Sequence, residues 1–450
     1  MKAAKISLFC FLGASLLLLV PLLARVLWRQ DILINWNATR QTVDGFGGSA
    51  TGYAEAFSSA QADGFFSVEK GLGLSILRVK LIPDTLGEDC GCVANSTPFR
   101  CVAGSRSQIV SGDLRVAQLA AERGARLVAA PWSPPAEMKS SGKYCGSGAM
   151  IGTPKNYAAY AADLASFPAL LAANGLSLDA ISIQNEPDVE NTYDTCTWTA
   201  LQIHDFIPYL WTALHSAGFP SIKVAAPEQS SWTFEKLGAA VQDPNVAADI
   251  GLIWGHAYLT ETPATVPASN GLHVWQSEVS GLEDYDGSMA DALRWARSIH
   301  SYMSAGANAW MYWNLDCGAA QFNSKSSMCL TDQSQNLAKR AYMLGQYAKF
   351  IRPGWQRIDV TNRGSLLVTA YKGPSRRFAI VVINSSYWAA RNQTFRLNGF
   401  ASKHSAVTPW LTSSSASLQA QPLIALSSDG TSVTCTIPRR SAVTLVGQAD

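Results

Sequence analysis

The segment ISIQNEPDVE, Ile181 to Glu190, ends a buried strand and is the clearest guide to the fold. Its first half alternates apolar and polar residues, which is typical of a strand with one face toward a core. A helical pattern precedes it over residues 154–173, and another follows it over 197–217. A strand enclosed in this way by two helices indicates a repeated strand–helix unit in an α/β fold.

The same rhythm runs from Asp44 to about residue 350. Strands are predicted at 45–50, 74–81, 126–131, 180–185, 222–227, 252–256, 272–278 and 308–314, and helices include 111–123, 288–305 and 336–350. Eight parallel units of this kind match a closed (β/α)8 TIM barrel over residues 44–350. A doubly wound open sheet is the alternative, but the glycine-rich GFGGSATG beginning at Gly45 lacks the GxGxxG spacing of a nucleotide-binding turn.

The pattern changes after Pro353, where helical periodicity stops. Short alternating runs separated by Ser-rich turns take over, so residues 351–450 are predicted to form a β-sandwich side domain. Residues 31–43 also alternate, in ILINWN, and are expected to add one or more strands to the same side domain.

Residues 1–30 resemble an export signal or a membrane anchor. Lys2 and Lys5 precede an uncharged apolar run from Ile6 to Ala24. The run approaches the roughly 20 residues that span a bilayer, and no clear small-x-small cleavage site precedes Arg25. A cleaved signal and a retained anchor both remain open, and either predicts an exported protein that is secreted, periplasmic or anchored with its folded part outside.

Eight cysteines follow the leader, an even number that favours disulfides in an exported protein. Cys317 and Cys329 are expected to pair, and the cluster from Cys90 to Cys145 is expected to pair locally. Zinc is disfavoured because Cys90 and Cys92 are too close for a CxxC knuckle and no paired histidines accompany them. We expect no metal and no cofactor.

The charge balance bears on the partners of the protein. Lys and Arg number 35 against 33 Asp and Glu, which leaves a net charge of +2. This argues against a nucleic-acid partner and against an acidic lipid surface. We expect a monomer.

Two glutamates stand at predicted strand ends, where the active sites of such barrels lie. Period-two alternation in ISIQNE places Ser182, Gln184 and Glu186 on the face toward the barrel interior. Glu278 ends the seventh predicted strand in GLHVWQSEVSG. A carboxylic acid and a carboxylate across one barrel mouth are sufficient for glycoside hydrolysis. Asp188 and Glu190 fall beyond Pro187 and fit a loop or a helix start.

Six ordered motifs carry a resemblance to a known family. They are DGFGGS at Asp44, APWSPPAEMKSSG at Ala130, IQNEP around Glu186, GHAY at Gly255, WQSE around Glu278 and WMYWNL at Trp310. Together they resemble glycoside hydrolase family 30, a family of retaining (β/α)8 glycosidases, over nearly all of the chain after the leader. The stretch IQNEPDVENTYDTCTWT is most similar to the bacterial xylanase branch.

The resemblance implies roles for individual residues. Glu186 is expected to be the general acid/base and Glu278 the nucleophile. Arg78 and Tyr258 would support the charge of the nucleophile, and Asn185 would bind the 2-hydroxyl of the sugar. Further substrate-binding candidates at strand ends are Trp132, His256, Trp310 and Trp313.

The resemblance also implies a substrate class. We expect a retaining endo-β-1,4-xylanase acting on xylan or glucuronoxylan. The alternatives are a β-1,6-glucanase or galactanase, an exo-β-glycosidase similar to glucosylceramidases, and a non-catalytic carbohydrate-binding protein. Glucuronoxylan specialists of the family have an arginine-bearing segment after the eighth strand, whereas NLDCGAAQFNSKSSMC at this position has no arginine for a bidentate carboxylate clamp.

Overall fold

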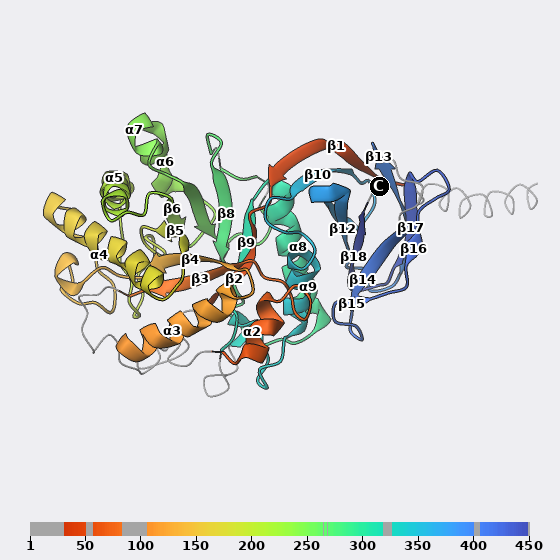
Figure 1. The fold of residues 1–450 in the computed structure, drawn as a ribbon, viewed down its shortest axis with the longest axis horizontal. Coiled ribbons are helices and arrows are strands. Elements are labelled where there is room, and N and C mark those ends of the chain that lie inside the picture. The colour runs from red at the N-terminus through yellow and green to blue at the C-terminus, as the bar shows by residue number, and fades with distance from the viewer. Residues whose placement is uncertain are drawn as a thin grey trace, which may run out of the picture.

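The protein consists of a closed parallel barrel and a side domain of mainly antiparallel strands, as the sequence predicts (Figure 1). The computed structural model describes residues 31–50, 57–82, 106–263, 265–267, 269–317, 326–399 and 406–448. The leader, with its two interpretations, and Cys90, Cys92 and Cys101 lie outside these residues. No helix in the described ranges is long and apolar enough to cross a membrane.

Eight strands close the barrel in chain order. They are β2 (Gly45–Ala50), β3 (Ile76–Leu81), β4 (Arg126–Pro131), β5 (Leu178–Ser182), β6 (Lys223–Gln229), β7 (Leu252–His256), β8 (His273–Glu278) and β9 (Ala309–Asn314). The helices around them are α2 (Ser59–Phe66), α3 (Arg106–Ala121), α4 (Pro154–Ala173), α5 (Ala200–Ser216), α6 (Gly238–Gln242), α7 (Pro244–Ala247), α8 (Met289–Ala305) and α9 (Lys339–Ala348).

Local sequence explains where these helices begin. Thr153 caps α4 by accepting a hydrogen bond from the backbone of Asn156, and Pro154 occupies the first helical turn, where it costs no hydrogen bond. Thr199 and Gln202 form a capping box at the start of α5. This cap delays α5 by three residues relative to the predicted start at 197.

The glycines of β2 serve close packing. A Cβ on Gly47 would lie 2.3 Å from the carbonyl oxygen of Ile76, and one on Gly48 would lie 2.5 Å from a methyl carbon of Leu315. The run GFGG therefore lets β2 approach its neighbours, which agrees with the absence of nucleotide-turn spacing.

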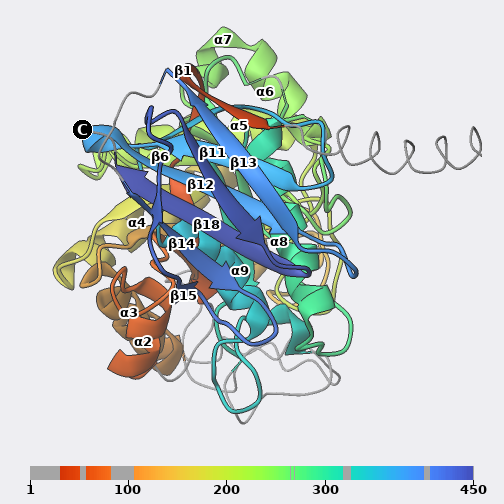
Figure 2. The same cartoon turned by 90° about the vertical axis from the view of Figure 1, so that its right-hand side faces the viewer.

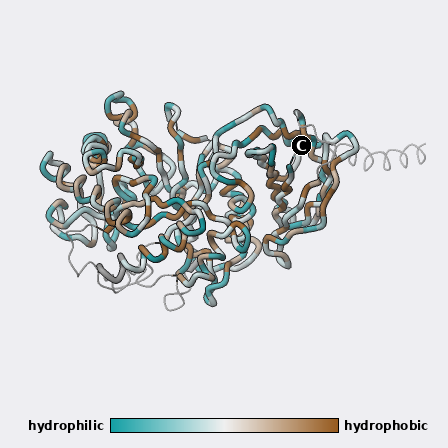
Figure 3. Tube along the Cα trace, in the orientation of Figure 1, coloured by the Kyte–Doolittle hydropathy of each residue, from teal (hydrophilic) through white to brown (hydrophobic). Residues whose placement is uncertain are grey.

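The barrel has an inner and an outer core. Alternate residues fill the interior, and the larger outer core lies between the strands and the helices. The interior side chains are Ile76, Val128, Ala180, Ala225, Leu252, Trp254, Trp275, Ala309 and Met311. Figure 3 shows that hydrophobic residues concentrate along the barrel strands and within the side domain.

The side domain is one sheet that folds over its own core (Figure 2). Its strands are β1 (Ile32–Thr42), β10 (Gln356–Thr361), β11 (Leu367–Lys372), β12 (Arg377–Asn384), β13 (Arg391–Asn398), β14 (Ala406–Thr412), β15 (Gln419–Ala420), β16 (Ile424–Ala425), β17 (Ser432–Ile437) and β18 (Ser441–Gln448). β1 pairs with β10 and β13, so the N-terminal strand belongs to this sheet.

Two cysteine predictions can be compared with the fold. Cys317 and Cys329 form a disulfide, as predicted. Cys145 is also disulfide-bonded, whereas Cys196 and Cys435 are buried thiols, so the even count did not mean that every cysteine is paired.

Candidate active site

Five ionisable side chains meet at the carboxyl ends of the barrel strands. Arg78 comes from β3, Glu228 from β6, His256 from the end of β7 and Glu278 from the end of β8, while Glu186 follows β5. All five are buried. Charged groups are rarely buried unless they are paired, so a cluster of this kind at the functional end of a barrel indicates a reactive site.

Glu278 is held by two donors, one on each oxygen. Nη1 of Arg78 donates to Oε2 at 2.7 Å, and the hydroxyl of Tyr258 donates to Oε1 at 2.7 Å. Burial raises the pKa of the Tyr258 hydroxyl well above its usual value, so this phenol remains a donor. Both contacts stabilise the carboxylate form of Glu278.

Glu186 has a different set of partners. Oε1 lies 3.2 Å from Nδ1 of His256, and Oε2 accepts a hydrogen bond from the hydroxyl of Tyr193 at 2.9 Å. The backbone of Glu186 has φ of 47°, in the left-handed region that residues other than glycine seldom occupy. Its N–H donates to the carbonyl oxygen of Glu228, which fixes this conformation. Strained backbone of this kind is often found where a side chain must be aimed.

The two glutamates lie close together. One carboxylate oxygen of Glu186, one of Glu278 and a ring nitrogen of His256 are all within 4.8 Å of one another. Retaining glycosidases hold their carboxyl groups at about 5 to 5.5 Å, whereas inverting enzymes need roughly 6.5 Å or more to admit a water. The spacing therefore suits direct attack by a carboxylate.

The same three side chains could in principle supply metal ligands. Two charges oppose that use. Arg78 already places a positive charge 2.7 Å from Glu278, and the surrounding carboxylates raise the pKa of His256, which favours its cationic form, whereas a ligand histidine must be neutral.

The charges in the cluster shift several pKa values. Burial alone would lower the pKa of His256, but Glu278, Glu186 and Glu228 together raise it to about 10. Burial alone would raise the pKa of Glu228, but Arg78 and His256 bring it below its usual value. Burial raises the pKa of Glu278, although the charges of His256 and Arg78 oppose this. Two cations thus face three glutamates, and one proton shared among the carboxyl groups would make the cluster neutral.

Glu228 was not predicted from the sequence. It is fully buried, and Oε1 accepts a hydrogen bond from Nε of Arg78 at 3.0 Å and lies 3.6 Å from Nε2 of His256. The predicted strand stopped at Pro227, one residue before Glu228 and two before the observed end of β6 at Gln229. The signal was nevertheless present in APEQ, because Glu228 lies at the carboxyl end of its strand, as Glu278 does. Tyr193 was missed as well, since it lies in an irregular loop that no periodicity marks.

Asn185 lies in the cluster, but not as alternation predicts. The strand β5 ends at Ser182, three residues before the predicted end, and Oδ1 of Asn185 accepts a hydrogen bond from Nη2 of Arg78 at 2.6 Å. Asn185 and Glu186 therefore both face the site, because the chain leaves the strand between Ser182 and Glu186. Asp188 braces the next loop by accepting hydrogen bonds from the backbone and hydroxyl of Ser230.

The predicted aromatic residues separate into two groups. Trp132 and Trp313 lie 5.7 Å apart, and the guanidinium of Arg78 lies 4.7 Å above the ring of Trp132, so these two border the cluster. The prediction for Trp310 is wrong. Its side chain is fully buried on the outer side of the barrel, where it packs against Trp295 of α8 and Tyr312.

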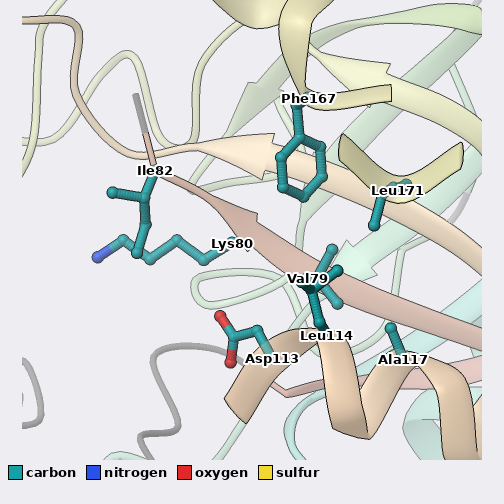
Figure 4. A pocket seen from close by; sticks show the side chains of 8 residues that line it. All are labelled: Val79, Lys80, Ile82, Asp113, Leu114, Ala117, Phe167 and Leu171. Atoms are coloured by element: carbon teal, nitrogen blue, oxygen red, sulfur yellow. The ribbon is translucent and has the colours of Figure 1, made fainter. Parts of the chain in front are cut away.

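An apolar hollow lies elsewhere, between β3, α3 and α4 (Figure 4). Val79 and Leu171 in its wall belong to the outer core, so the hollow is outside the barrel. Its polar rim consists of Asp113 and Lys80, and Lys80 is already paired with Asp194 at 2.6 Å. We assign no ligand to it.

Comparison with known proteins agrees with this geometry. Residues 108–315 match the glycosyl hydrolase family 30 TIM-barrel domain. The chain is 30% identical to glucuronoxylanase XynC of Bacillus subtilis strain 168 over 461 aligned positions, covering 99% of this chain and 98% of that protein. It is similar to the crystal structure of the family 30 subfamily 8 xylanase Xyn30A of Clostridium acetobutylicum, with a TM-score of 0.78, 30% identity, and coverage of 93% of this chain and 100% of that one. A family 30 endoxylanase from Clostridium papyrosolvens gives a TM-score of 0.74 at 28% identity, with coverage of 93% and 100%.

Proposed function

Because the chain belongs to glycoside hydrolase family 30, we propose that it is a retaining endo-β-1,4-xylanase with Glu278 as nucleophile and Glu186 as general acid/base. The observation that carries this proposal is that one carboxylate oxygen of Glu186 lies within 4.8 Å of one of Glu278. The two carboxyl groups also have different hydrogen-bond partners, Arg78 and Tyr258 for Glu278 and His256 and Tyr193 for Glu186. The full-length similarity to proteins named as xylanases supports the choice of substrate.

In the first step, Glu278 would attack the anomeric carbon of a xylose unit while Glu186 gives a proton to the leaving glycosidic oxygen. Arg78 and Tyr258 orient the attacking carboxylate and keep it ionised. In the second step, Glu186 would take a proton from water, which then hydrolyses the glycosyl ester and releases Glu278.

The contact between His256 and Glu186 bears on the source of the first proton. Nδ1 of His256 lies 3.2 Å from Oε1 of Glu186, so one proton can reside on either group. We propose that this pair stores the catalytic proton and that Glu186 delivers it. When no substrate is bound, this proton resides mainly on His256, because the pKa of its imidazole is raised to about 10.

The substrate-binding surface is proposed to include Trp132 and Trp313, which border the cluster, and Asn185 at the 2-hydroxyl. The segment after β9 contains Lys325 but no arginine. A bidentate clamp for a uronic acid requires a guanidinium. We therefore propose that cleavage does not require glucuronate substituents.

We further propose that the protein acts outside the cytoplasm as a monomer. The proposal of export is supported by the apolar run of residues 6–24 after two lysines.

Product analysis on four polymers tests the substrate. Unsubstituted xylan and glucuronoxylan should both yield oligosaccharides, whereas β-1,6-glucan and β-1,6-galactan should remain intact. Cleavage restricted to glucuronoxylan would contradict the proposed independence from glucuronate. Release of sugars only from the β-1,6-linked polymers would replace the xylanase assignment.

A mechanism-based label tests the two roles. A 2-fluoro-xylobioside with a good leaving group should add one glycosyl mass to the peptide that contains Glu278, and Glu278→Gln should abolish both labelling and turnover. Glu186→Gln should still accept the label when the leaving group needs no proton. Labelling of any other peptide, or inverted product configuration by NMR, would refute the retaining mechanism.

A further inference from the structure

Three connections of the side domain come together at one end of its sheet. The register places Thr361 beside Leu33, Leu367 beside Ile383, and Asn384 beside Ser441. The turn 362–366, the loop 385–390 and the turn 438–440 therefore lie at the same end as the start of β1. We refer to these three connections together as the basic face.

The basic face displays two aromatic residues. Trp388 is 90% exposed and Tyr387 is 56% exposed, although aromatic side chains of this size are usually at least half buried. Their loop is fixed in place. The side-chain amide of Asn384 donates to the carbonyl oxygens of Ala389 and Pro438, and the backbone N–H of Arg440 donates to Ser386.

The charges on the basic face have one sign. Arg363, Arg439 and Arg440 belong to its three connections, which contain no acidic residue. Arg440 lies 4.5 Å above the ring of Tyr387, and Arg439 donates to the carbonyl oxygen of the same residue, so aromatic and cationic groups form one surface. The net charge of the chain is only +2, and for that reason the composition did not reveal this local excess.

The chain also enters the fold beside the basic face. β1 runs parallel to β13, with Ile32 opposite Phe395, so the chain comes into the sheet from the end where the loop 385–390 lies (Figure 2). The apolar run of residues 6–24 precedes this point in the sequence, separated only by residues 25–31. Those residues reach at most about 25 Å when fully extended. If the run is held in a bilayer, the basic face must remain close to the surface of that bilayer.

We propose that the basic face rests on the headgroups of an anionic bilayer in which residues 6–24 are anchored. Tryptophan and tyrosine favour the interfacial zone of membranes, and arginines are attracted to anionic lipids. The contact would fix the side domain against the membrane and direct the barrel away from it. This inference is independent of the glycosidase assignment.

Photo-crosslinking of the full-length chain tests the proposal. Trp388→p-benzoylphenylalanine is reconstituted into vesicles of phosphatidylethanolamine and phosphatidylglycerol and irradiated. The matched control is Leu423→p-benzoylphenylalanine, because Leu423 is 70% exposed and precedes β16, which pairs with the start of β14 at the opposite end of the sheet. Position 388 should crosslink to lipid at least about five times more than position 423. Replacing Arg363, Arg439 and Arg440 by serine should reduce the yield at position 388 by at least roughly fivefold.

Two outcomes would overturn the proposal. One is equal lipid crosslinking at positions 388 and 423. The other is crosslinking of position 388 to added glucuronoxylan in preference to lipid, which would make the basic face a site for acidic polysaccharide. Turnover of soluble xylan by each variant serves as a check on folding, since none of these residues belongs to the active site.

Discussion

Glu228 pairs with both cations of the active site, although the proposed mechanism gives it no contact with the substrate. It lies 2.9 Å from Nη2 of Arg78 and 3.6 Å from His256, and is fully buried. We expect Glu228→Gln to lower kcat by about 10- to 100-fold with little change in KM, because Arg78 and His256 lose the charge that positions them. Steady-state kinetics on xylan would measure this. The control is Asp188→Asn, because Asp188 accepts hydrogen bonds from Ser230 in the loop that follows Glu228. This variant should retain most of kcat. An equal loss of kcat in both variants would point to general damage of that loop.

His256 determines how far the active site retains its proton as pH rises. Its pKa is raised to about 10, so the imidazolium persists at neutral pH and is lost only as the pH rises toward that value. If the His256–Glu186 pair stores the catalytic proton, His256→Gln should move the alkaline limb of kcat/KM to lower pH by at least about one unit. The pH profile of the variant, measured beside that of the wild type, tests this. An unchanged alkaline limb together with a lower kcat would mean that His256 has only a packing role.

At the scale of elements, a buried arginine connects α9 to α8, to β9 and to the loop that precedes α8. Arg340 pairs with Asp291 of α8 at 2.9 Å and donates to the hydroxyl of Tyr312 at 3.0 Å and to the carbonyl oxygen of Asp286 at 2.8 Å. Arg340→Met would leave Asp291 buried without its partner, and we expect a loss of about 3 to 5 kcal/mol in the free energy of unfolding. Denaturant titration would measure it. The exposed Arg376→Met should change stability by less than about 0.5 kcal/mol, and a similar small effect in Arg340→Met would contradict the assigned role.

The elements also show how far sequence periodicity could predict the structure. It located β2, β4 and β7 without error in their bounds, because each is a short run of mainly apolar and small residues with a glycine or a proline at or next to one end. It failed where the chain leaves regular geometry, as between Ser182 and Glu186, since the left-handed backbone of Glu186 leaves no mark in the pattern. The prediction for Trp310 failed because the pattern WMYWN does not show which face of β9 points inward. Met311 faces the barrel interior, so its neighbour Trp310 must face outward.

The active site likewise has features that the sequence predicts and features that only the folded structure shows. Glu186 and Glu278 were singled out because family motifs surround them and because both stand at the carboxyl end of a predicted strand. Their separation, the shared position of His256 and the charge of Glu228 depend on which strands adjoin across the barrel. That arrangement is set by tertiary packing, which local patterns do not contain.

At the scale of the whole molecule, the barrel and the side domain share a polar junction. Gln346 of α9 is buried, its side-chain amide donates to the hydroxyl of Thr412 at 2.8 Å, and its backbone carbonyl oxygen accepts from the hydroxyl of Thr444 at 2.8 Å. The described chain also starts in the side sheet with β1, forms the barrel and returns to the sheet with β10, so the side sheet is built from segments on both sides of the barrel. We therefore expect one cooperative unfolding transition for residues 31–450.

Gln346→Leu tests this coupling. The substitution removes the two hydrogen bonds that the side-chain amide of Gln346 donates to the hydroxyl of Thr412 and to the carbonyl oxygen of Trp410, and we expect a loss of about 1 to 3 kcal/mol, because losing buried hydrogen bonds costs roughly that much. Calorimetry should show the whole transition moving to lower temperature as a single peak. Thr434→Ala, which removes an exposed hydroxyl pair with Thr394 inside the side sheet, should leave the peak nearly unchanged. A split into two peaks in Gln346→Leu, with one peak at the wild-type temperature, would show that the barrel and the side domain unfold independently.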